Sequence, residues 1–229
     1  MNLKKLTAKV IGREHKKLQP ALNDIDQKLK KYLPHKKGFF IEAGANDGYL
    51  QSNTYYLEKK RRWKGILIEG IPELYKKCKK ERSKSVVYNC ALVSRDFPDP
   101  TVTMHYAHLM SVVDNSLKTQ DEQEKHLSTG IDIQNLEGSY SIEVPTKTLE
   151  SILDDTPNLP TIDFFSLDVE GYELNVLDGL NLSHYRPRYI LVEARFFNEV
   201  NNHMAKHGYR LIDKLTHHDC LYQDITQNN

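Results

Sequence analysis

The segment GFFIEAGANDG, residues 38–48, places a short apolar run, a carboxylate and a glycine-rich turn directly after one another. An apolar run of this length that ends at a turn is typical of a buried strand, and residues 52–58 after the turn have the pattern of a helix. Gly44 and Gly48 allow the backbone to turn tightly and to approach a ligand where a Cβ atom would clash. The segment therefore predicts the strand, turn and helix unit of an α/β protein.

The same unit recurs on the C-terminal side of this segment. Continuous apolar strands that alternate with helices are typical of a parallel sheet covered on both faces. The runs at 209–215 and 219–223 are expected to pair as an antiparallel hairpin. We therefore predict an α/β fold with a doubly wound, mostly parallel, seven-stranded sheet closed by that hairpin. The other expected strands are 65–69, 86–90, 162–167 and 189–192, with helices from Pro72, over 172–180 and over 196–207.

Two parts of the chain depart from this alternation. Residues 4–33 have apolar positions at three- and four-residue steps, interrupted by Pro20, and are expected to form a helical cap on the sheet. Between about 93 and 147 the periodicity weakens, with strand-like pieces at 102–106 and 140–144. We interpret this segment as an insertion that recognises the substrate. The chain is accordingly divided into a cap, residues 1–35, and a main domain, residues 36–229.

Composition and charge limit the classes of partner. The 229 residues are 39% hydrophobic and 28% charged, as in an ordinary globular protein. The 32 basic and 31 acidic side chains give a net charge of +1, which provides no overall field to attract a polyanion. Basic clusters at 36–37, 59–62 and 76–84 are interpreted as solvated faces, because the last two interleave with a helical apolar pattern. We therefore expect no nucleic-acid partner.

The chain has no segment typical of membrane insertion or export. No apolar run approaches the roughly 20 residues that span a bilayer, and the basic N-terminus lacks the apolar core of a secretory signal. Cys78, Cys90 and Cys220 are far apart, which argues against a disulfide framework or a cysteine zinc site. These features predict a cytoplasmic protein with reduced thiols and no membrane span. They carry no signal of an oligomeric state.

Polar residues at the strand ends indicate the ligand, because open α/β sheets bind ligands beyond the carboxyl ends of their strands. The first turn has GxxxG spacing, and the chain has neither a GxGxxG dinucleotide pattern nor a GxxxxGK[ST] phosphate loop. Glu69 follows about 20 residues later, where a carboxylate accepts both ribose hydroxyls of a nucleoside. Taken alone, the GxxxG segment is explained as a tight turn, and Glu69 is explained as an acid at the helix N-terminus before Pro72. Together they favour a nucleoside without a pyrophosphate, of which S-adenosylmethionine is the common example.

A third motif, LDVEGYELNVLDG at 167–179, follows the fourth expected strand. Together with EAGANDG at 42–48, IEG at 68–70 and NCAL at 89–92, it resembles the FkbM family of S-adenosylmethionine-dependent O-methyltransferases. The resemblance runs from about residue 39 to the closing hairpin. It implies a Rossmann-like class I methyltransferase fold. It also implies that the methyl group of bound S-adenosylmethionine is transferred to a hydroxyl, commonly of a sugar or a polyketide-type acceptor.

The resemblance also assigns residues to the cofactor. The glycine turn is expected beside the methionine part and the ribose, Glu69 on the ribose hydroxyls, and residues 89–92 beside the adenine. Glu42 stands where the family often has aspartate, a change that keeps the charge and a contact to the methionine part. Asp168 is expected beside the sulfonium. The full set of expected cofactor contacts is Glu42, Gly44, Asn46, Asp47, Gly48, Glu69, Asn89, Ala91 and Asp168.

Three carboxylates after the fourth and fifth strands, Asp168, Glu170 and Glu193, are the candidates for catalysis. Methyl transfer is an in-line displacement, so it needs alignment and a base or metal ion that helps remove the hydroxyl proton. Asp168 is the first choice, whereas Glu170 is equally explained as the partner of a basic residue in the next helix, and Glu193 as an ion pair with Arg195. If the enzyme uses a divalent cation, Asp168 and Glu193 are the natural ligands. The alternative bases are the histidines His105, His108, His217 and His218.

The expected function is therefore S-adenosylmethionine-dependent O-methylation of a small-molecule or carbohydrate acceptor, such as a sugar or a glycan precursor. Two alternatives stay open: methylation of a small secondary metabolite, and a non-catalytic module that binds S-adenosylmethionine. A side chain at position 44, as in Gly44→Val, is expected to exclude the cofactor without unfolding the domain.

Overall fold

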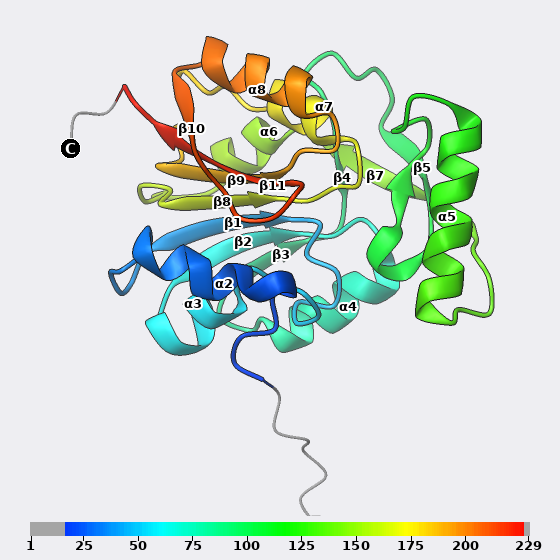
Figure 1. Cartoon of the computed structure of the whole chain (residues 1–229), viewed down its shortest axis with the longest axis horizontal. Coiled ribbons are helices and arrows are strands. Elements are labelled where there is room, and N and C mark those ends of the chain that lie inside the picture. The colour runs from blue at the N-terminus through cyan, green and yellow to red at the C-terminus, as the bar shows by residue number, and fades with distance from the viewer. Residues whose placement is uncertain (1–16, 227–229) are drawn as a thin grey trace, which may run out of the picture.

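The computed structural model describes residues 17–226 and contains a seven-stranded sheet of order β10-β11-β9-β8-β1-β2-β3 (Figure 1). Neighbouring strands run parallel except β11, which is antiparallel to both β9 and β10. The predicted sheet with its closing hairpin is thereby confirmed, and β11 lies between β9 and β10. The strands are β1 (Phe39–Ala43), β2 (Lys64–Ile68), β3 (Val86–Tyr88), β8 (Phe164–Leu167), β9 (Tyr189–Glu193), β10 (Tyr209–Lys214) and β11 (Asp219–Asp224).

Helices cover both faces of this sheet (Figure 1). Along β1 the side chains of Phe40 and Ile41 pack into different layers, and both are fully buried. The strands are apolar at successive positions because both of their faces are buried. None of the helices in residues 17–226 is long and apolar enough to cross a bilayer. One face carries α2 (Ile25–Lys28), α3 (Tyr55–Arg61) and α4 (Pro72–Glu81), and the other carries α6 (Leu149–Asp154), α7 (Glu173–Asp178) and α8 (Phe197–Lys206).

The N-terminal helix is shorter than the sequence pattern predicts. Of the helix expected over 4–33, residues 4–16 lie outside the described residues, and residues 17–21 are not helical. The chain is helical from η1 (Leu22–Asp24) through α2 to η2 (Leu29–Lys31). Asn23 and Asp24 have left-handed φ values of 52° and 56°, which interrupt a regular helix. Its apolar residues Ile25, Leu29 and Leu33 are buried in the same cluster as the sheet residue Phe40.

The segment between β3 and α6 forms a second, smaller sheet of order β4-β7-β5-β6. The third expected strand ends early, at Tyr88, and the chain then enters this second sheet. Helix α5 (Gln120–Gln134), which the sequence pattern does not predict, begins after Thr119, whose hydroxyl accepts from the Glu122 amide. Figure 1 shows α5 and β5 beyond the carboxyl ends of the parallel strands. The strands are β4 (Ala91–Leu92), β5 (Thr101–His105), β6 (Val112–Val113) and β7 (Ser141–Lys147).

Candidate active site

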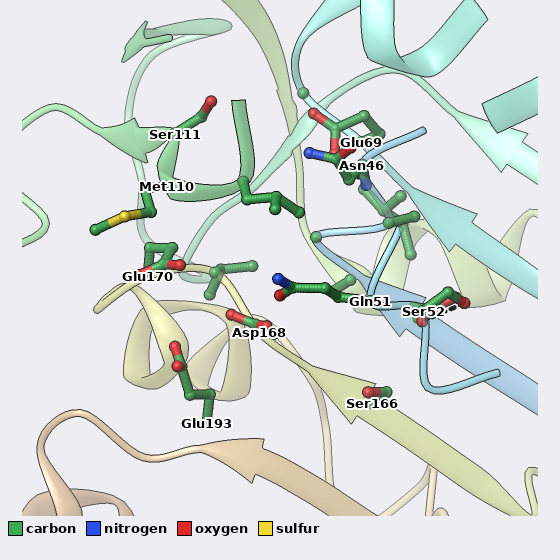
Figure 2. A pocket seen from close by; sticks show the side chains of 18 of the residues that line it. Asn46, Gln51, Ser52, Glu69, Met110, Ser111, Ser166, Asp168, Glu170 and Glu193 are labelled. Carbon is green, nitrogen blue, oxygen red and sulfur yellow. Dashed lines mark hydrogen bonds between the residues drawn. The ribbon is translucent and has the colours of Figure 1, made fainter. Parts of the chain in front are cut away.

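A pocket of about 370 Å³ lies at the carboxyl ends of β1, β2, β8 and β9 (Figure 2). Its walls come from the loops after these strands and from the second sheet, η3 (His108–Met110) and α5. This edge is where open α/β sheets bind their ligands. Of the expected site residues, the pocket is lined by Glu42, Gly44, Asn46, Glu69, Ala91, Asp168, Glu170 and Glu193, whereas Asp47, Gly48 and Asn89 lie outside its lining.

Gly44 begins the turn after β1 and lies against the chain that follows β8. Its φ is +78°, and a Cβ atom there would lie 1.8 Å from the backbone oxygen of Asp168. The Gly44 amide also donates to the carbonyl of Ile68 at 3.1 Å, so three strand ends meet at this residue. A side chain at position 44 would therefore force β1 and β8 apart. The structure thus contradicts the expectation that Gly44→Val leaves the fold intact.

Glu42 ends β1, and the chain's own donors occupy its buried carboxylate. Oε1 accepts from Ser52 Oγ and from the Asn53 amide, both at 3.0 Å, and Oε2 accepts from Thr54 Oγ1 at 2.6 Å. These bonds hold the segment in a turn, so the following helix begins later than expected, at Tyr55. Glu42 thus shapes the loop beside the pocket, and its contact with the cofactor stays a prediction.

Arg82 is the cation that balances this carboxylate. Its side chain is fully buried and donates to Glu58 through Nε at 3.1 Å and to Glu42 through Nη1 at 3.3 Å. Gly48 packs against it, because the Gly48 carbonyl accepts from Nη1 at 3.3 Å and a Cβ atom there would lie 2.8 Å from Arg82 Cγ. The interpretation of the 76–84 cluster as a solvated face is therefore wrong at Arg82. Gly48 serves this packing.

Asn46 and Asp47 stabilise the turn between these glycines. Asn46 has a φ of +48°, a left-handed conformation that asparagine tolerates better than most residues. Its Nδ2 donates to the carbonyl of His108 at 3.3 Å, which connects the turn to η3. Asp47 Oδ1 accepts from the amides of Tyr49 and Leu50, both at 2.8 Å. Asn46 therefore faces the pocket, whereas Asp47 closes the turn on its outer side.

Glu69 follows β2 and connects the glycine turn to α4. Its Oε2 accepts from the Asn46 amide at 2.7 Å, and its Oε1 accepts from the Ile71 amide, at the start of α4, at 2.8 Å. Burial raises the pKa of Glu69 to about 7, although these backbone donors oppose the shift. Each carboxylate oxygen has a second lone pair, so the group keeps acceptor capacity after these bonds. The helix N-terminal role is thus present, and the ribose contact stays a prediction.

The residues expected beside the adenine divide into two kinds. Asn89 Nδ2 donates to the carbonyls of Glu69 and Gly70, at 2.9 and 2.7 Å, and so fixes the loop after β2. Residues 90–92 line the pocket, where Ala91 and Leu92 form an apolar wall with one residue each from β5 and β6, which the sequence did not predict there. Such a surface suits the face of a flat base. The wall consists of Ala91, Leu92, Met104 and Val113.

Asp168, Glu170 and Glu193 form a carboxylate group on the side of the pocket toward β8 and β9 (Figure 2). Each offers an oxygen atom, and these atoms lie within 4.8 Å of one another. Burial among protein atoms and the charges of Glu193 and Glu170 raise the pKa of Asp168 well above its ordinary value, although its side chain is open to the pocket. Glu193 Oε2 is buried without a hydrogen-bond partner among the described residues. Such a group favours retention of a proton or binding of a cation.

Arg195 and His126 hold Glu170 in place. Arg195 Nη2 donates to Glu170 Oε2 at 2.6 Å and to His126 Nδ1 at 3.3 Å. We assign the ring proton to His126 Nε2, which lies 3.1 Å from the carbonyl of Met110. Burial and the Arg195 charge lower the pKa of His126 to about 4, in keeping with a neutral ring. Arg195, which precedes α8, thus pairs with Glu170, and within residues 17–226 it forms no ion pair with Glu193.

Replacement of His126 tests how the insertion is tied to the carboxylate group. His126→Leu removes an acceptor for Arg195 and a donor to Met110, so the free energy of unfolding is expected to fall by ~1–3 kcal/mol. His126→Gln offers one acceptor and one donor on a neutral side chain and is expected to recover most of that loss. Urea unfolding of the three proteins measures both effects. Equal losses in the two variants would contradict the assigned bonds.

Of the four histidines expected as alternative bases, His108 of η3 lines the pocket. Its φ is +54°, and its Nδ1 is buried without a hydrogen-bond partner in the part of the chain that the structure describes. The others lie outside the pocket lining: His105 contacts Asp114 at 2.9 Å, and the two histidines of the turn between β10 and β11 are exposed. These two exposed histidines, which do not line the pocket, are His217 and His218.

A family profile described as "Methyltransferase FkbM domain" matches residues 42–211. The match spans most of the chain and includes the glycine turn, Glu69 and the carboxylate group. This chain belongs to the FkbM methyltransferase family. The predicted family is thereby confirmed, together with S-adenosylmethionine as the cofactor and the Rossmann-like class I fold. No curated protein matches the chain.

Solved structures resemble this FkbM methyltransferase only distantly. A TehB-like SAM-dependent methyltransferase from Corynebacterium glutamicum is 9% identical with a TM-score of 0.44, and the alignment covers 97% of this chain and 95% of that chain. A SAM-dependent methyltransferase from Aquifex aeolicus is 14% identical with a TM-score of 0.40, and 97% of each chain is covered. Precorrin-6y C5,15-methyltransferase from Geobacter metallireducens is 11% identical with a TM-score of 0.44, at 92% and 91% coverage. Scores this low leave the family assignment to rest on the sequence match.

The pocket of this FkbM methyltransferase fits the parts of S-adenosylmethionine. Its volume of about 370 Å³ lies within the usual range of small-molecule sites. Glu69 supplies a carboxylate at the end of β2, and Met104 of the apolar wall lies against Gly70, whose carbonyl accepts from Asn89. Asp168 is open to the pocket, and a sulfonium cation beside it would favour the charged form of its carboxyl group. The donor set therefore agrees with a positively charged nucleoside.

Proposed function

We propose that this FkbM methyltransferase transfers the methyl group of S-adenosylmethionine to a hydroxyl oxygen of a sugar or glycan precursor. The observation that carries the proposal is the carboxylate group at the ends of β8 and β9. This group lies in the same pocket as Glu69, which follows β2. A base next to the cofactor serves an acceptor that must lose a proton, and a hydroxyl is such an acceptor.

In the proposed reaction, Glu69 and Asp168 have different roles. S-adenosylmethionine supplies an activated methyl group on a sulfonium when it is bound. In the proposal Glu69 accepts the ribose hydroxyls, and Asp168 lies beside the acceptor oxygen and takes its proton. Burial and the charges of Glu193 and Glu170 raise the pKa of Asp168, and a higher pKa makes its carboxylate form a stronger base toward the hydroxyl proton.

The insertion is assigned to the acceptor. Leu109 and Met110 of η3 and Ile133 of α5 line the pocket, and Ile133 is 70% exposed. A sugar ring has apolar faces and hydroxyl groups at its edge, so apolar side chains and carboxylates in one pocket suit it. The presence of both kinds of side chain in one pocket supports a carbohydrate as the acceptor class.

A divalent cation forms part of the proposal to be tested. Magnesium and manganese prefer oxygen ligands, which the carboxylate group provides. Asp168 and Glu193 are the proposed ligands, because Arg195 already engages Glu170. The buried Oε2 of Glu193, which has no hydrogen-bond partner within residues 17–226, fits this role. A cation there would lower the pKa of the acceptor hydroxyl and of Asp168, so in a metal-dependent reaction the cation, and not Asp168 as a base, would activate the hydroxyl.

Calorimetric titration and a turnover panel test the proposal. Titrations with S-adenosylmethionine and S-adenosylhomocysteine, each with and without magnesium, measure cofactor and metal binding. The panel offers free sugars, nucleotide-linked sugars and small hydroxylated metabolites, and mass spectrometry detects the methylated product. A methylated sugar supports the proposal. Methylation of metabolites alone selects the second function, and binding without any turnover selects a non-catalytic module. Loss of turnover with a chelator, restored by magnesium, assigns the metal.

Glu69→Gln is expected to weaken S-adenosylmethionine binding by ~10–100-fold, because a charged acceptor of ribose hydroxyls is lost. The carboxylate form accepts both hydroxyls, so the affinity of the wild type is expected to rise with pH through about 7 and then level off. The variant is expected to lose this pH dependence. Titrations from about pH 6 to about pH 8 measure both effects.

Glu73→Gln is the matched control for this variant, because Glu73 is exposed in the first turn of α4. It is expected to leave both the affinity and its pH dependence unchanged. If Glu69→Gln binds as tightly as the wild type at every pH, Glu69 does not contact the ribose.

A further inference from the structure

The charge of the chain is unevenly distributed along the sequence, although the net charge is near zero. Residues 28–84 contain sixteen Lys and Arg against six Asp and Glu, a net charge of +10. Residues 85–229 contain ten Lys and Arg against twenty-two Asp and Glu, a net charge of −12. A near-neutral total therefore hides a strongly polarised molecule.

The basic residues gather at the amino ends of β1, β2 and β3. Lys36 and Lys37 precede β1, Lys64 begins β2, and Lys84 precedes β3. These strands are parallel neighbours, so their amino ends lie at one edge of the sheet. The last turns of α3 and α4 reach the same edge. We define the basic strip as the seven exposed residues Lys36, Lys37, Lys60, Arg62, Lys64, Lys80 and Lys84.

Hydrogen bonds between the segments show that the strip is continuous. The Lys37 amide donates to the carbonyl of Arg61 at 3.0 Å, which joins the segment before β1 to the end of α3. Lys59 Nζ donates to the carbonyl of Glu81 at 2.6 Å, which joins α3 to the end of α4. The three segments that carry the strip are therefore neighbours at this edge of the sheet.

Structural needs do not account for the strip. The acids of the same region already form ion pairs with other residues. Lys59 pairs with Glu58 and Glu81, and His35 pairs with Asp163. Within residues 17–226 none of the seven strip residues forms an ion pair. Cations at helix C-termini favour the helix dipole, which explains those on α3 and α4 but not those before the three strands.

We propose that the basic strip docks this protein on an anionic lipid surface. Six of its seven residues are lysines, whose attraction to an anionic bilayer is worth about fivefold in partitioning per residue. Proteins that bind single-stranded nucleic acid stack bases on aromatic or arginine side chains, and Trp63, which lies between Arg62 and Lys64 of the strip, is 1% exposed. The pocket opens at the carboxyl ends of the strands, so a bilayer at the opposite edge leaves it accessible. This inference does not depend on the identity of the acceptor.

Co-sedimentation of the full chain with vesicles tests the proposal. The wild type is expected to bind phosphatidylcholine vesicles that contain phosphatidylglycerol, to ignore pure phosphatidylcholine, and to dissociate as salt is added. The triple variant Lys36→Glu, Lys64→Glu and Lys84→Glu changes positions outside the helices. Its partition coefficient on the anionic vesicles is expected to fall by about a hundredfold or more. Thermal melting and S-adenosylmethionine binding are expected to remain as in the wild type.

A second triple variant separates the strip from net charge. Lys125→Glu, Lys206→Glu and Arg210→Glu change the net charge equally at exposed positions outside the strip. This control is expected to bind the anionic vesicles within about threefold of the wild type. Equal losses in the two variants, or equal binding to neutral vesicles, would overturn the proposal. The proposal would also be overturned if the wild type bound a single-stranded RNA but not the vesicles, and if the strip variant alone lost the RNA binding. That result would assign the strip to nucleic acid.

Discussion

Asp168→Asn is expected to lower kcat by about a hundredfold to ten-thousandfold, while the dissociation constant of S-adenosylmethionine changes by less than about tenfold. Asparagine keeps the volume of the side chain and the backbone bond from residue 168 to the Ala43 carbonyl, at 3.2 Å. The pocket therefore retains its shape. The substitution removes the group that accepts the hydroxyl proton. Turnover at saturating acceptor and calorimetric titration of the cofactor measure the two quantities separately.

Asp96→Asn is the control for this variant, since Asp96 is exposed and lies outside the pocket lining. It is expected to keep the kcat of the wild type. An unchanged kcat in Asp168→Asn would remove Asp168 from catalysis and leave His108, which lines the same pocket, as the next base to replace.

The parallel sheet could be predicted because burial on both faces leaves a continuous apolar run in each strand. Residues 65–68 and 189–192 are such runs. Helix α5 could not be predicted by the same rule. Its buried residues recur at helical spacing but are Gln123, His126 and Gly130, so the helix has no apolar stripe. The sequence pattern therefore does not indicate that His126 bonds Arg195.

The site could be predicted only in part, because order along the chain places acids at strand ends but does not reveal their partners. Glu69 and Asp168 follow apolar runs, and both line the pocket. The donors to Glu42 come from a later loop and from Arg82, which no local pattern connects to it. A signal for Arg82 was present, since Leu74, Cys78 and Arg82 continue one buried stripe at four-residue steps.

Arg82→Leu is expected to lower the free energy of unfolding by ~3–5 kcal/mol, because it leaves buried Glu42 without its cation and leaves buried Glu58 with Lys59 alone, at 3.4 Å. Glu58 and Glu42 are 1% and 4% exposed. The guanidinium also donates to Thr54 Oγ1 at 2.8 Å, so the loop beside the pocket loses a bond at the same time. Urea unfolding followed by circular dichroism measures the change. Arg95→Leu is the control, because Arg95 pairs with Glu150 at the surface and is expected to matter by less than about 1 kcal/mol.

The double variant Arg82→Leu and Glu58→Leu separates the loss of an ion pair from the loss of packing. If the instability of Arg82→Leu comes from buried negative charge that has lost Arg82, removal of Glu58 takes away one of the two carboxylates that Arg82 pairs with. The double variant is then expected to be more stable than Arg82→Leu alone, with a coupling of about 1–3 kcal/mol. If the two losses simply add, Arg82 acts through its contacts with Phe40 and Tyr55, whose ring centroids lie 5.3 and 5.7 Å from its Cζ atom. Additive losses would thus contradict the electrostatic role that we assign to Arg82.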